Sequence, residues 1–363
     1  MAHTRRPTQA DIARAAGVSP AVVSLVINDR ANGKIKISGE TQERVWAVVR
    51  ERGYVPNMAA RQLAGGRNNL LGVFTYESAF PMQQTSFYYP FLVGIEEQAE
   101  ISGYNLLLFT RFSVDRRRQV YRDDVNQLQV AEGAILLGTN EDRAELARLY
   151  RDGFPFVFVG RRELDEGPLA YTAADYAGAT KALTRQLTEF GHRHILYIGA
   201  TSFNESAADR EQGFLQALRD AGISNPDTSV RRFDLTTLDV DRLRAWFADG
   251  VTALAVEQMS TALHVLALAR CMDLHVPDDF SLIALGKADD PTLDHHGIDT
   301  FYIPHREMGA QAVSLLTRML AEPDADFPRQ LTIPCTPATG RTIGPVPLRP
   351  PAVKENATPS DDR

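Results

Sequence analysis

Residues 11–28 read DIARAAGVSPAVVSLVIN, and their spacing predicts two short helices joined by a tight turn. Thr8 precedes the apolar positions and has Asp11 three residues after it, which is the pattern of an N-cap with a return contact. Gly17 supplies the residue that ends the first helix. We therefore expect a short amphipathic helix between Thr8 and Gly17.

A second and a third helix follow from the same kinds of signal. After a tight turn, Ser19 can cap and Pro20 can occupy the first position of a helix that runs to about Ile27. The third helix starts after Ser38 and stops at Gly53. The three helices are expected to close a small core from Ile12, Ala16, Val18, Val23, Val26, Val45 and Val49.

Basic residues gather at the amino-terminal end. Residues 1–67 hold 11 Lys and Arg against 5 Asp and Glu, so the whole-chain net charge of −7 leaves −13 for the remainder. A small basic module supplies phosphate contacts, whereas an acidic body limits non-specific binding to polyanions. The asymmetry indicates a polyanionic partner, with chance clustering as the alternative.

The face of the second helix that the core leaves outside is the candidate recognition surface. In a helix-turn-helix, the second helix enters the major groove and its first residues meet base edges. A helical hairpin of a protein-interaction domain is the alternative interpretation. The predicted DNA contacts in this region are Thr8, Ser19, Pro20, Ala21, Ser24, Leu25 and Asn28.

Residues 11–28 resemble the helix-turn-helix of the LacI/GalR repressor family, and residues 38–52 resemble that family's third helix. Residues 53–57, GYVPN, with 59–65, AARQLAG, resemble its hinge helix. The resemblance implies a homodimer that reads a pseudo-palindromic operator in double-stranded DNA.

The hinge segment can also be judged by its length. About nine residues flanked by Pro56 and Gly65 are too few to hold an isolated helix in water, so we expect this helix to form only on DNA. The resemblance implies that Leu63 pairs with its dimer mate and wedges into the minor groove. A plain interdomain linker is the alternative. The predicted DNA contacts of the hinge are Asn57, Ala60 and Leu63.

One recognition position departs from the family's usual pattern. The family often has arginine where Leu25 stands, and arginine to guanine is the commonest specific base contact. Ala21 and Leu25 would favour thymine methyl groups instead. Residues 30–37, which include Lys34 and Lys36, are expected to contact phosphates.

From Leu70 onward, short apolar runs alternate with amphipathic stretches, which is typical of α/β folds with parallel sheets buried on both faces. Strands are predicted at 70–75, 106–109, 134–137, 156–159, 195–198, 253–256 and 282–285. Helices are predicted at 91–101, 177–190, 211–221 and 261–272. So many strands favour two doubly wound parallel-sheet subdomains, with a ligand crevice near the strand carboxyl ends.

The resemblance continues through this region, which is similar to the family's periplasmic-binding-protein-like core. Residues 191–199, GHRHILYIG, are similar to its core signature, and 210–214, REQGF, resemble the segment whose arginine reaches the ligand. The implied organisation is a DNA-binding domain at 1–56, a hinge at 57–67, an effector-binding and dimerisation core at 68–343 and a disordered tail at 344–363. Subdomain one would take 68–171 and 300–329, and subdomain two 172–299 and 330–343.

Aromatic and polar side chains near the expected strand ends favour a polyhydroxyl effector. A sugar or sugar derivative is the first hypothesis, and a nucleobase or a phosphorylated metabolite is the alternative. Core packing is the other interpretation for each ring. Gly160 stands where the family often has aspartate, so the ligand itself cannot be transferred by resemblance. The predicted effector contacts are Tyr76, Phe87, Phe91, Arg161, Arg210, Glu257 and Lys287.

Several function classes are disfavoured. The sequence shows neither a long apolar run nor an apolar leader, so we expect a cytoplasmic protein without a membrane partner. Cys271 and Cys335 are interpreted as core thiols, and neither His192 nor His194 has metal-ligand spacing. Because nucleotide loops and nucleophile elbows are missing, neither a cofactor nor an enzyme is expected.

A ligand-controlled transcription regulator is therefore the leading hypothesis. A repressor is favoured over an activator by family habit, and its ligand could be an inducer or a co-repressor. A solute-binding protein or an enzyme on the same core fold is the alternative.

Overall fold

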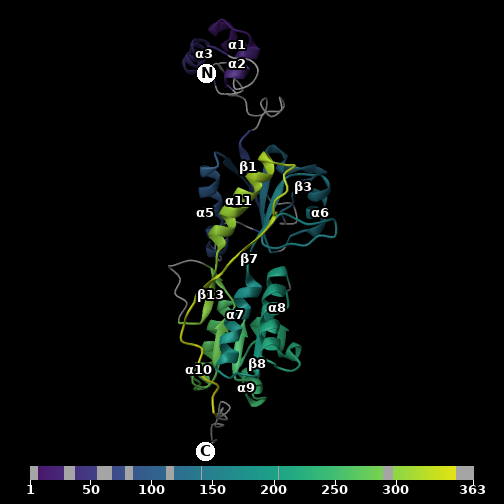
Figure 1. Ribbon diagram of the computed structural model, residues 1–363, viewed down its shortest axis with the longest axis vertical. Helices are drawn as coiled ribbons and strands as arrows, with labels where there is room; N and C mark the ends of the chain where they lie inside the picture. The colour runs from purple at the N-terminus through teal and green to yellow at the C-terminus, as the bar shows by residue number, and fades with distance from the viewer. Residues whose placement is uncertain are drawn as a thin grey trace, which may run out of the picture. The chain divides into compact units, whose positions relative to one another are not determined.

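The computed structural model describes residues 7–27, 37–54, 68–77, 85–111, 118–139, 141–202, 204–288 and 297–348. The chain forms two compact units, Met1–Asn69 and Leu70–Arg363, which are drawn in Figure 1. Among the described helices, no single one is long and apolar enough to cross a membrane; the first two pass the length and composition test only as a pair bent by 104°.

The first unit, here the head, contains α1 (Gln9–Ala16), α2 (Pro20–Ile27) and α3 (Gly39–Arg52). The expected capping box is present, because Thr8 accepts from the Asp11 backbone while the Asp11 carboxylate accepts from the Thr8 backbone. Gly17 and Gly53 close α1 and α3 in the left-handed conformation. Local capping chemistry therefore fixes the helix ends of the head.

The head has a core of its own, and it contains nearly all of the side chains expected there. Ile12, Val23 and Val45 are fully buried, whereas Val18 is only partly buried. Arg44 of α3 donates from Nε to the Ala16 carbonyl at 3.0 Å, which satisfies a carbonyl at the end of α1. The core also includes Ala13, Ala16, Val26, Ile27, Val49 and Tyr54.

The second unit, here the core unit, contains two parallel sheets. The larger has the order β14–β7–β6–β5–β1–β2, and the smaller has the order β11–β10–β8–β9. The strands of the larger sheet are β1 (Leu70–Thr75), β2 (Asn105–Phe109), β5 (Gly133–Leu137), β6 (Phe156–Val159), β7 (Tyr171–Ala174) and β14 (Gln330–Ile333). Those of the smaller sheet are β8 (Ile195–Ala200), β9 (Val230–Phe233), β10 (Ala253–Val256) and β11 (Ser281–Ala284).

Two small sheets complete the strands. They contain β12 (Lys287–Ala288), β13 (Thr300–Ile303) and β15 (Thr336–Ala338) in one, and β3 (Tyr121–Arg122) with β4 (Val125–Asn126) in the other. Single 3₁₀ turns lie at η2 (Gln127–Val130), η3 (Pro226–Ser229) and η4 (Leu235–Thr237). The first subdomain is the part built on the larger sheet, and the second subdomain is the part built on the smaller.

Helices cover both faces of each large sheet, as parallel sheets require (Figure 1). In the first subdomain, α5 (Thr85–Ile101) and α11 (His305–Ala321) pack together on one face, and α6 (Arg143–Arg151) packs on the other. Gly94 and Gly309 let α5 and α11 approach closely, because a Cβ on either would overlap the other helix's backbone. The second subdomain has α7 (Tyr176–Glu189), α8 (Glu205–Asp220), α9 (Val240–Ala248) and α10 (Met259–Cys271).

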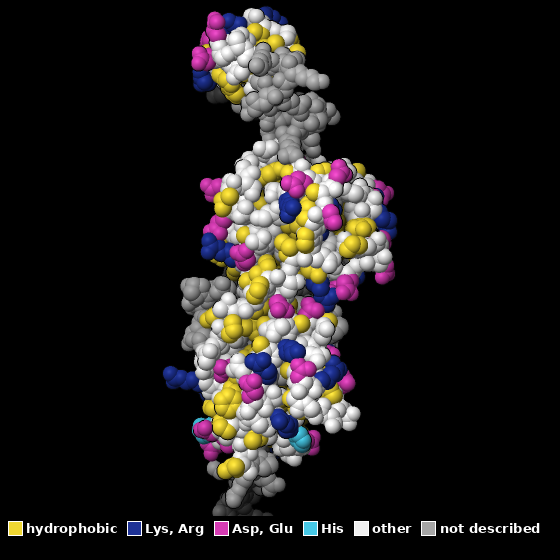
Figure 2. All heavy atoms as spheres, in the orientation of Figure 1, with side chains coloured by type: hydrophobic (Ala, Val, Ile, Leu, Met, Phe, Trp, Pro, Cys, Tyr) yellow, Lys and Arg dark blue, Asp and Glu magenta, His cyan; other side chains and the backbone are white. Residues whose placement is uncertain are grey.

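The chain crosses between the subdomains three times, and the sheet pairing moves two expected boundaries. β7 and β14 pair with each other in the larger sheet, so the crossings follow residues 174 and 333 rather than 171 and 329. The third crossing strand, β13, pairs with β12 and β15 and leads directly into α11. On the visible face of the core unit, basic and acidic side chains are interspersed (Figure 2).

His192 connects several segments at the amino-terminal ends of the strands in the second subdomain. Its Nδ1 lies 2.9 Å from the Thr252 hydroxyl, and its Nε2 lies 2.9 Å from the Ser281 hydroxyl and 3.0 Å from the Gly344 carbonyl. The ring is fully buried. It therefore joins the entries of three strands to the carboxyl-terminal segment, which is a structural use rather than a metal-binding one.

Replacing His192 by Ala should lower the free energy of unfolding by about 3 kcal/mol, because the buried Ser281 hydroxyl and Gly344 carbonyl lose a partner. Burial lowers the pKa of His192, and the Gly344 carbonyl partly opposes this. The folded protein thus holds the neutral ring. The contribution of His192 to the free energy of unfolding is complete above the pKa of the unfolded state, and it is lost as the pH falls from that value toward the lower pKa of the folded state. Urea unfolding at about pH 7.5 and about pH 5.5 should show the gap between parent and variant shrinking in acid; a constant gap contradicts the assignment.

Candidate functional site

The outward face of α2 presents the residues expected to read DNA. Pro20 and Ala21 are exposed, and Ser24 and Leu25 are half-buried, whereas Val23 faces the head core. The four outward residues lie on the first and second turns of one helix, as a groove-reading helix requires.

Two of the predicted contacts also have a capping role. The Thr8 hydroxyl donates to the Asp11 carboxylate at 2.7 Å, and the Ser19 hydroxyl accepts from the Val22 backbone at 3.3 Å. Both residues are exposed. The remaining predicted DNA contacts, Asn28, Asn57, Ala60 and Leu63, lie outside the described residues.

Arg210 of α8, a predicted effector contact, is held by contacts at the end of the second sheet. It is 8% exposed, and its Nε donates to the Leu285 carbonyl at 2.6 Å while Nη1 donates to the Ser206 carbonyl at 2.9 Å. Its guanidinium lies 3.8 Å from the centroid of the Tyr176 ring. Arg210 therefore ties α8 to the end of β11 and to the first residue of α7, at the carboxyl edge of the second sheet.

Aromatic side chains of α5 lie opposite a histidine that begins α11. Phe91 is buried with its ring centroid 4.3 Å from that of His305, and Phe87 is 38% exposed with its centroid 5.6 Å from the same ring. Burial, together with the nearby Arg210 charge, lowers the pKa of His305 to about 3. The structure thus brings Phe87, Phe91 and Arg210 together around a neutral imidazole.

His305 was not among the residues singled out from the sequence. It is 2% exposed, and neither ring nitrogen has a hydrogen-bond partner among the described residues. Cys335 is a second neighbour of Arg210: burial raises the pKa of its thiol to about 12, although the Arg210 charge opposes the shift. The only sequence signal for either residue is its position just after a strand that crosses between subdomains.

Tyr76 does not line the crevice, in contrast to the sequence expectation. Side chains alternate along a strand, so Tyr76 lies on the same face of the sheet as Phe74, with the two ring centroids 5.0 Å apart. Both pack with Leu146 and Leu149 of α6, and Tyr76 is 7% exposed. Burial, followed by the nearby carboxylates, raises the pKa of Tyr76. It is a core residue.

Arg161 was predicted as an effector contact, but its charge is already paired. Its guanidinium holds the Asp209 carboxylate through two contacts, Nε at 3.1 Å and Nη2 at 2.7 Å, and also contacts the Glu163 carboxylate. The pairing disfavours Arg161 as the partner of a phosphorylated effector.

Glu257 and Lys287 both lie in the second subdomain. The Glu257 carboxylate is 3.4 Å from Arg232 Nη1. Burial, followed by the Glu257 charge, raises the pKa of Tyr197, and the Arg210 charge opposes the shift. Lys287 is 7% exposed, with Nζ 5.8 Å from the centroid of the Tyr302 ring. Glu257 is therefore paired with Arg232, while Lys287 packs along the crossing strand.

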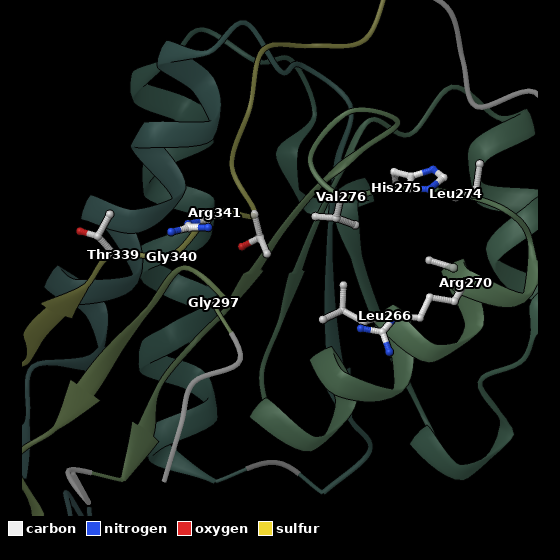
Figure 3. A pocket seen from close by; sticks show the side chains of 11 residues that line it. Leu266, Arg270, Leu274, His275, Val276, Gly297, Thr339, Gly340 and Arg341 are labelled. Carbon is white, nitrogen blue, oxygen red and sulfur yellow. The ribbon is translucent and has the colours of Figure 1, made fainter. Parts of the chain in front are cut away.

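A separate surface pocket of about 660 Å³ lies on the second subdomain (Figure 3). It is lined by the end of α10, including Arg270, by His275 and Val276, and by the loop that contains Arg341. Its described lining residues include neither Arg210 nor any strand of the larger sheet. This pocket is therefore distinct from the crevice, and we assign no ligand to it.

Comparison with protein families matches nearly the whole chain. Residues 8–57 match the model for bacterial regulatory proteins of the lacI family. Residues 78–258 match the periplasmic binding proteins and sugar-binding domain of the LacI family, and 184–343 match a periplasmic binding protein-like domain. The chain belongs to the LacI family of regulatory proteins.

Members of the LacI family with curated names are similar over most of the chain. The transcriptional regulator CelR of Thermobifida fusca is 29% identical over 87% of this chain and 92% of its own. The catabolite control protein A of Priestia megaterium is 25% identical over 87% and 93%. The protein is accordingly a DNA-binding transcriptional regulator.

Solved LacI-family structures share the fold. A CelR–cellobiose complex has a TM-score of 0.60 at 24% identity and covers 93% of this chain and all of its own. A lac repressor dimer bound to operator and an anti-inducer has a TM-score of 0.68 at 22% identity, with 94% of this chain covered and all of its own. These likenesses agree with the predicted helix-turn-helix head and the core of two parallel-sheet subdomains.

Replacing Arg210 by Met should destabilise the core by about 2 kcal/mol even without a ligand, because the Leu285 carbonyl loses its donor and Tyr176 loses its cationic neighbour. Arg219→Met on the same helix is the matched control, since Arg219 is about half exposed and pairs with the exposed Asp227 at 3.4 Å. Urea unfolding curves measure both variants. Equal stability of the two would show that the Arg210 contacts contribute nothing to the folded state.

Proposed function

We propose that this regulator is a homodimeric repressor that reads a pseudo-palindromic operator with α2 and responds to a sugar bound beside Arg210. The observation that carries the DNA half is the exposed first turn of α2 on an independently packed basic head. A two-fold axis would place the two α2 helices in successive major grooves. In the hinge, Asn57, Ala60 and Leu63 would contact DNA as the family resemblance implies.

The half-site is expected to include thymine contacts. Ala21 is exposed and Leu25 is half-buried, and neither can make the bidentate hydrogen bond that arginine makes to guanine. Apolar contact with the thymine C5-methyl group is what such side chains offer. Phosphate contacts from the basic head would supply the salt-dependent part of the affinity.

Replacing Ala21 by Asp should weaken operator binding at least tenfold, because the carboxylate would be placed against base edges and phosphates that are electronegative. Ala47→Asp is the matched control, since Ala47 is an exposed alanine on α3 of the same head. Fluorescence anisotropy with operator DNA compares the two at one salt concentration. Equal weakening by both variants would mean that the effect is general charge repulsion and that α2 has no special role.

The proposed effector is a neutral sugar or sugar derivative. Phe87 offers a partly exposed ring, Arg210 a cationic donor and Glu257, which directly follows β10, an acceptor, which together suit hydroxyl groups on an apolar ring face. A relative in this family has been solved with cellobiose. Because Arg161 is neutralised by Asp209, a phosphorylated metabolite is less well supported than a neutral sugar.

We propose that the effector controls operator affinity by closing the crevice between the subdomains. An effector can change operator affinity only by as much as its affinity differs between two states of the protein. The helix predicted at 57–67 is only marginally stable, so a small shift between the subunits decides whether the paired hinge helices form. Operator affinity is therefore most sensitive to the effector at this segment. We further propose that the protein is cytoplasmic, has no catalytic role and needs no cofactor or metal.

A thermal-shift panel of neutral sugars, sugar phosphates and nucleobases tests the effector class, since a ligand of the folded state raises the melting temperature. We expect a neutral sugar to raise the melting temperature and to change operator affinity in the anisotropy assay. A response confined to sugar phosphates or nucleobases would overturn the sugar assignment while leaving the DNA half intact.

A further inference from the structure

Two carboxylates of α8 reach across to the first subdomain. Glu205 and Asp209 are four residues apart and therefore lie on one face of the helix. Asp209 receives the paired contacts of Arg161, which follows β6 in the larger sheet. Both side chains are largely buried, at 23% exposed for Arg161 and 17% for Asp209. A bidentate pair with this burial is stronger than an ordinary surface ion pair.

Glu205 joins two more arginines of the first subdomain. Arg143 Nη2 lies 2.5 Å from Glu205 Oε1, and Arg162 Nη1 lies 3.7 Å from Oε2. The backbone of Glu163 also donates to Oε1, at 3.4 Å. Although burial alone would raise it, the pKa of Glu205 is lowered by its own backbone hydrogen bond, by Arg162 and by Arg143. The carboxylate is thus held charged between the two subdomains.

Arg162 is anchored on its own side of the crevice. It is 5% exposed, pairs with Glu141 at 2.9 Å, donates to the Gly138 carbonyl at 2.7 Å and lies 4.5 Å from the Phe158 ring centroid. These contacts all belong to the first subdomain. Arg162 is therefore held in place by the first subdomain itself, and the ion pairs form when α8 of the second subdomain lies against it.

The cluster is not needed to complete either subdomain. The α6 side of the larger sheet and the α9–α10 side of the smaller one are closed by apolar side chains. If the subdomains separated, Glu205 and Asp209 would lose their arginine partners. The arginines of the first subdomain would then outnumber the carboxylates beside them. The contacts hence depend on the distance between the subdomains, not on the fold of either.

The same helix carries the candidate effector contact. Asp209 and Arg210 are consecutive, and Arg210 holds the Leu285 carbonyl while Asp209 holds Arg161. The Arg210 contact lies within the second subdomain, whereas the Asp209 contact joins the two subdomains, so α8 carries both the candidate effector contact and the link to the first subdomain.

We propose that Arg143, Arg161, Arg162, Glu205 and Asp209 form a latch, here the α8 latch, that keeps the subdomains together in the absence of effector. The latch sets the fraction of protein whose crevice is already closed, and apparent effector affinity scales with that fraction. The effect on effector affinity rests on the proposed effector site, whereas the latch itself concerns the ligand-free protein alone.

The test measures the distance between subdomains without any ligand. Spin labels are attached to the full-length chain through Ala144→Cys on α6 and Ala245→Cys on α9, both exposed positions. A Cys271→Ser background is used because Cys271 is exposed, in contrast to the core thiol expected from the sequence. Cys335 reacts slowly because its thiol pKa is raised to about 12. Pulsed electron paramagnetic resonance then gives the distribution of distances between the two labels.

Asp209→Asn and Arg161→Met should each move most of the population to longer distances, and the double variant should add nothing further because the same pair is already broken. Asp124→Asn is the matched control: it removes the 3.0 Å pair with Arg148, which lies wholly within the first subdomain, and should leave the distribution unchanged. About 0.5 M NaCl should lengthen the parent's distances as well, although less than the variants, since part of the cluster is buried.

Distributions that are the same in parent, Asp209→Asn and Arg161→Met would overturn the latch. Circular dichroism melts of each variant exclude unfolding as the cause of a longer distance. A failed sugar panel would not affect this outcome, because no effector enters the measurement.

Discussion

Burial of parallel strands on both faces is the constraint on which the rest of the core depends. Strands such as β5 and β10 are apolar throughout and fully buried, so each sheet must be covered by helices on two sides. Parallel strands then all end at one edge, and that edge is where loops can place polar side chains. Arg210, Glu257 and Arg161 lie after or beside such ends, so both the candidate effector site and the α8 latch follow from the sheet direction.

The fold could be predicted where one segment carries its own signal. The capping residues Thr8 and Gly17 indicated the ends of α1, and uninterrupted apolar runs indicated most strands of the two large sheets. Three strands of these sheets escaped detection: the edge strands β9, VRRF, and β14, QLTI, are not buried enough to be apolar, and the inner strand β7, YTAA, lacks an apolar run. The second boundary, expected after residue 329, was misplaced for the same reason: β14 is recognisable only by its pairing with β7.

The site was less predictable because its contacts join distant segments. Tyr76 was nominated from its position after a strand, but the alternation of side chains turns it toward α6. Arg161 was nominated as an effector contact without its partner, since Asp209 is 48 residues away and nothing local marks the pair. His305 shows no pattern in the sequence, and only the packing of α11 against α5 explains its burial. Arg210 was nominated from the resemblance alone, and its role as an effector contact stays a prediction.

These long-range contacts also determine how control can work. A regulator needs two arrangements of similar free energy, and each factor of ten between them corresponds to about 1.4 kcal/mol. A few half-buried ion pairs contribute free energies of the required size. Placing Asp209 next to Arg210 on one helix lets a bound ligand and the charge pairs act on the same movement. The chain thus separates a rigid part, the two sheets, from a reversible one, the charged face of α8.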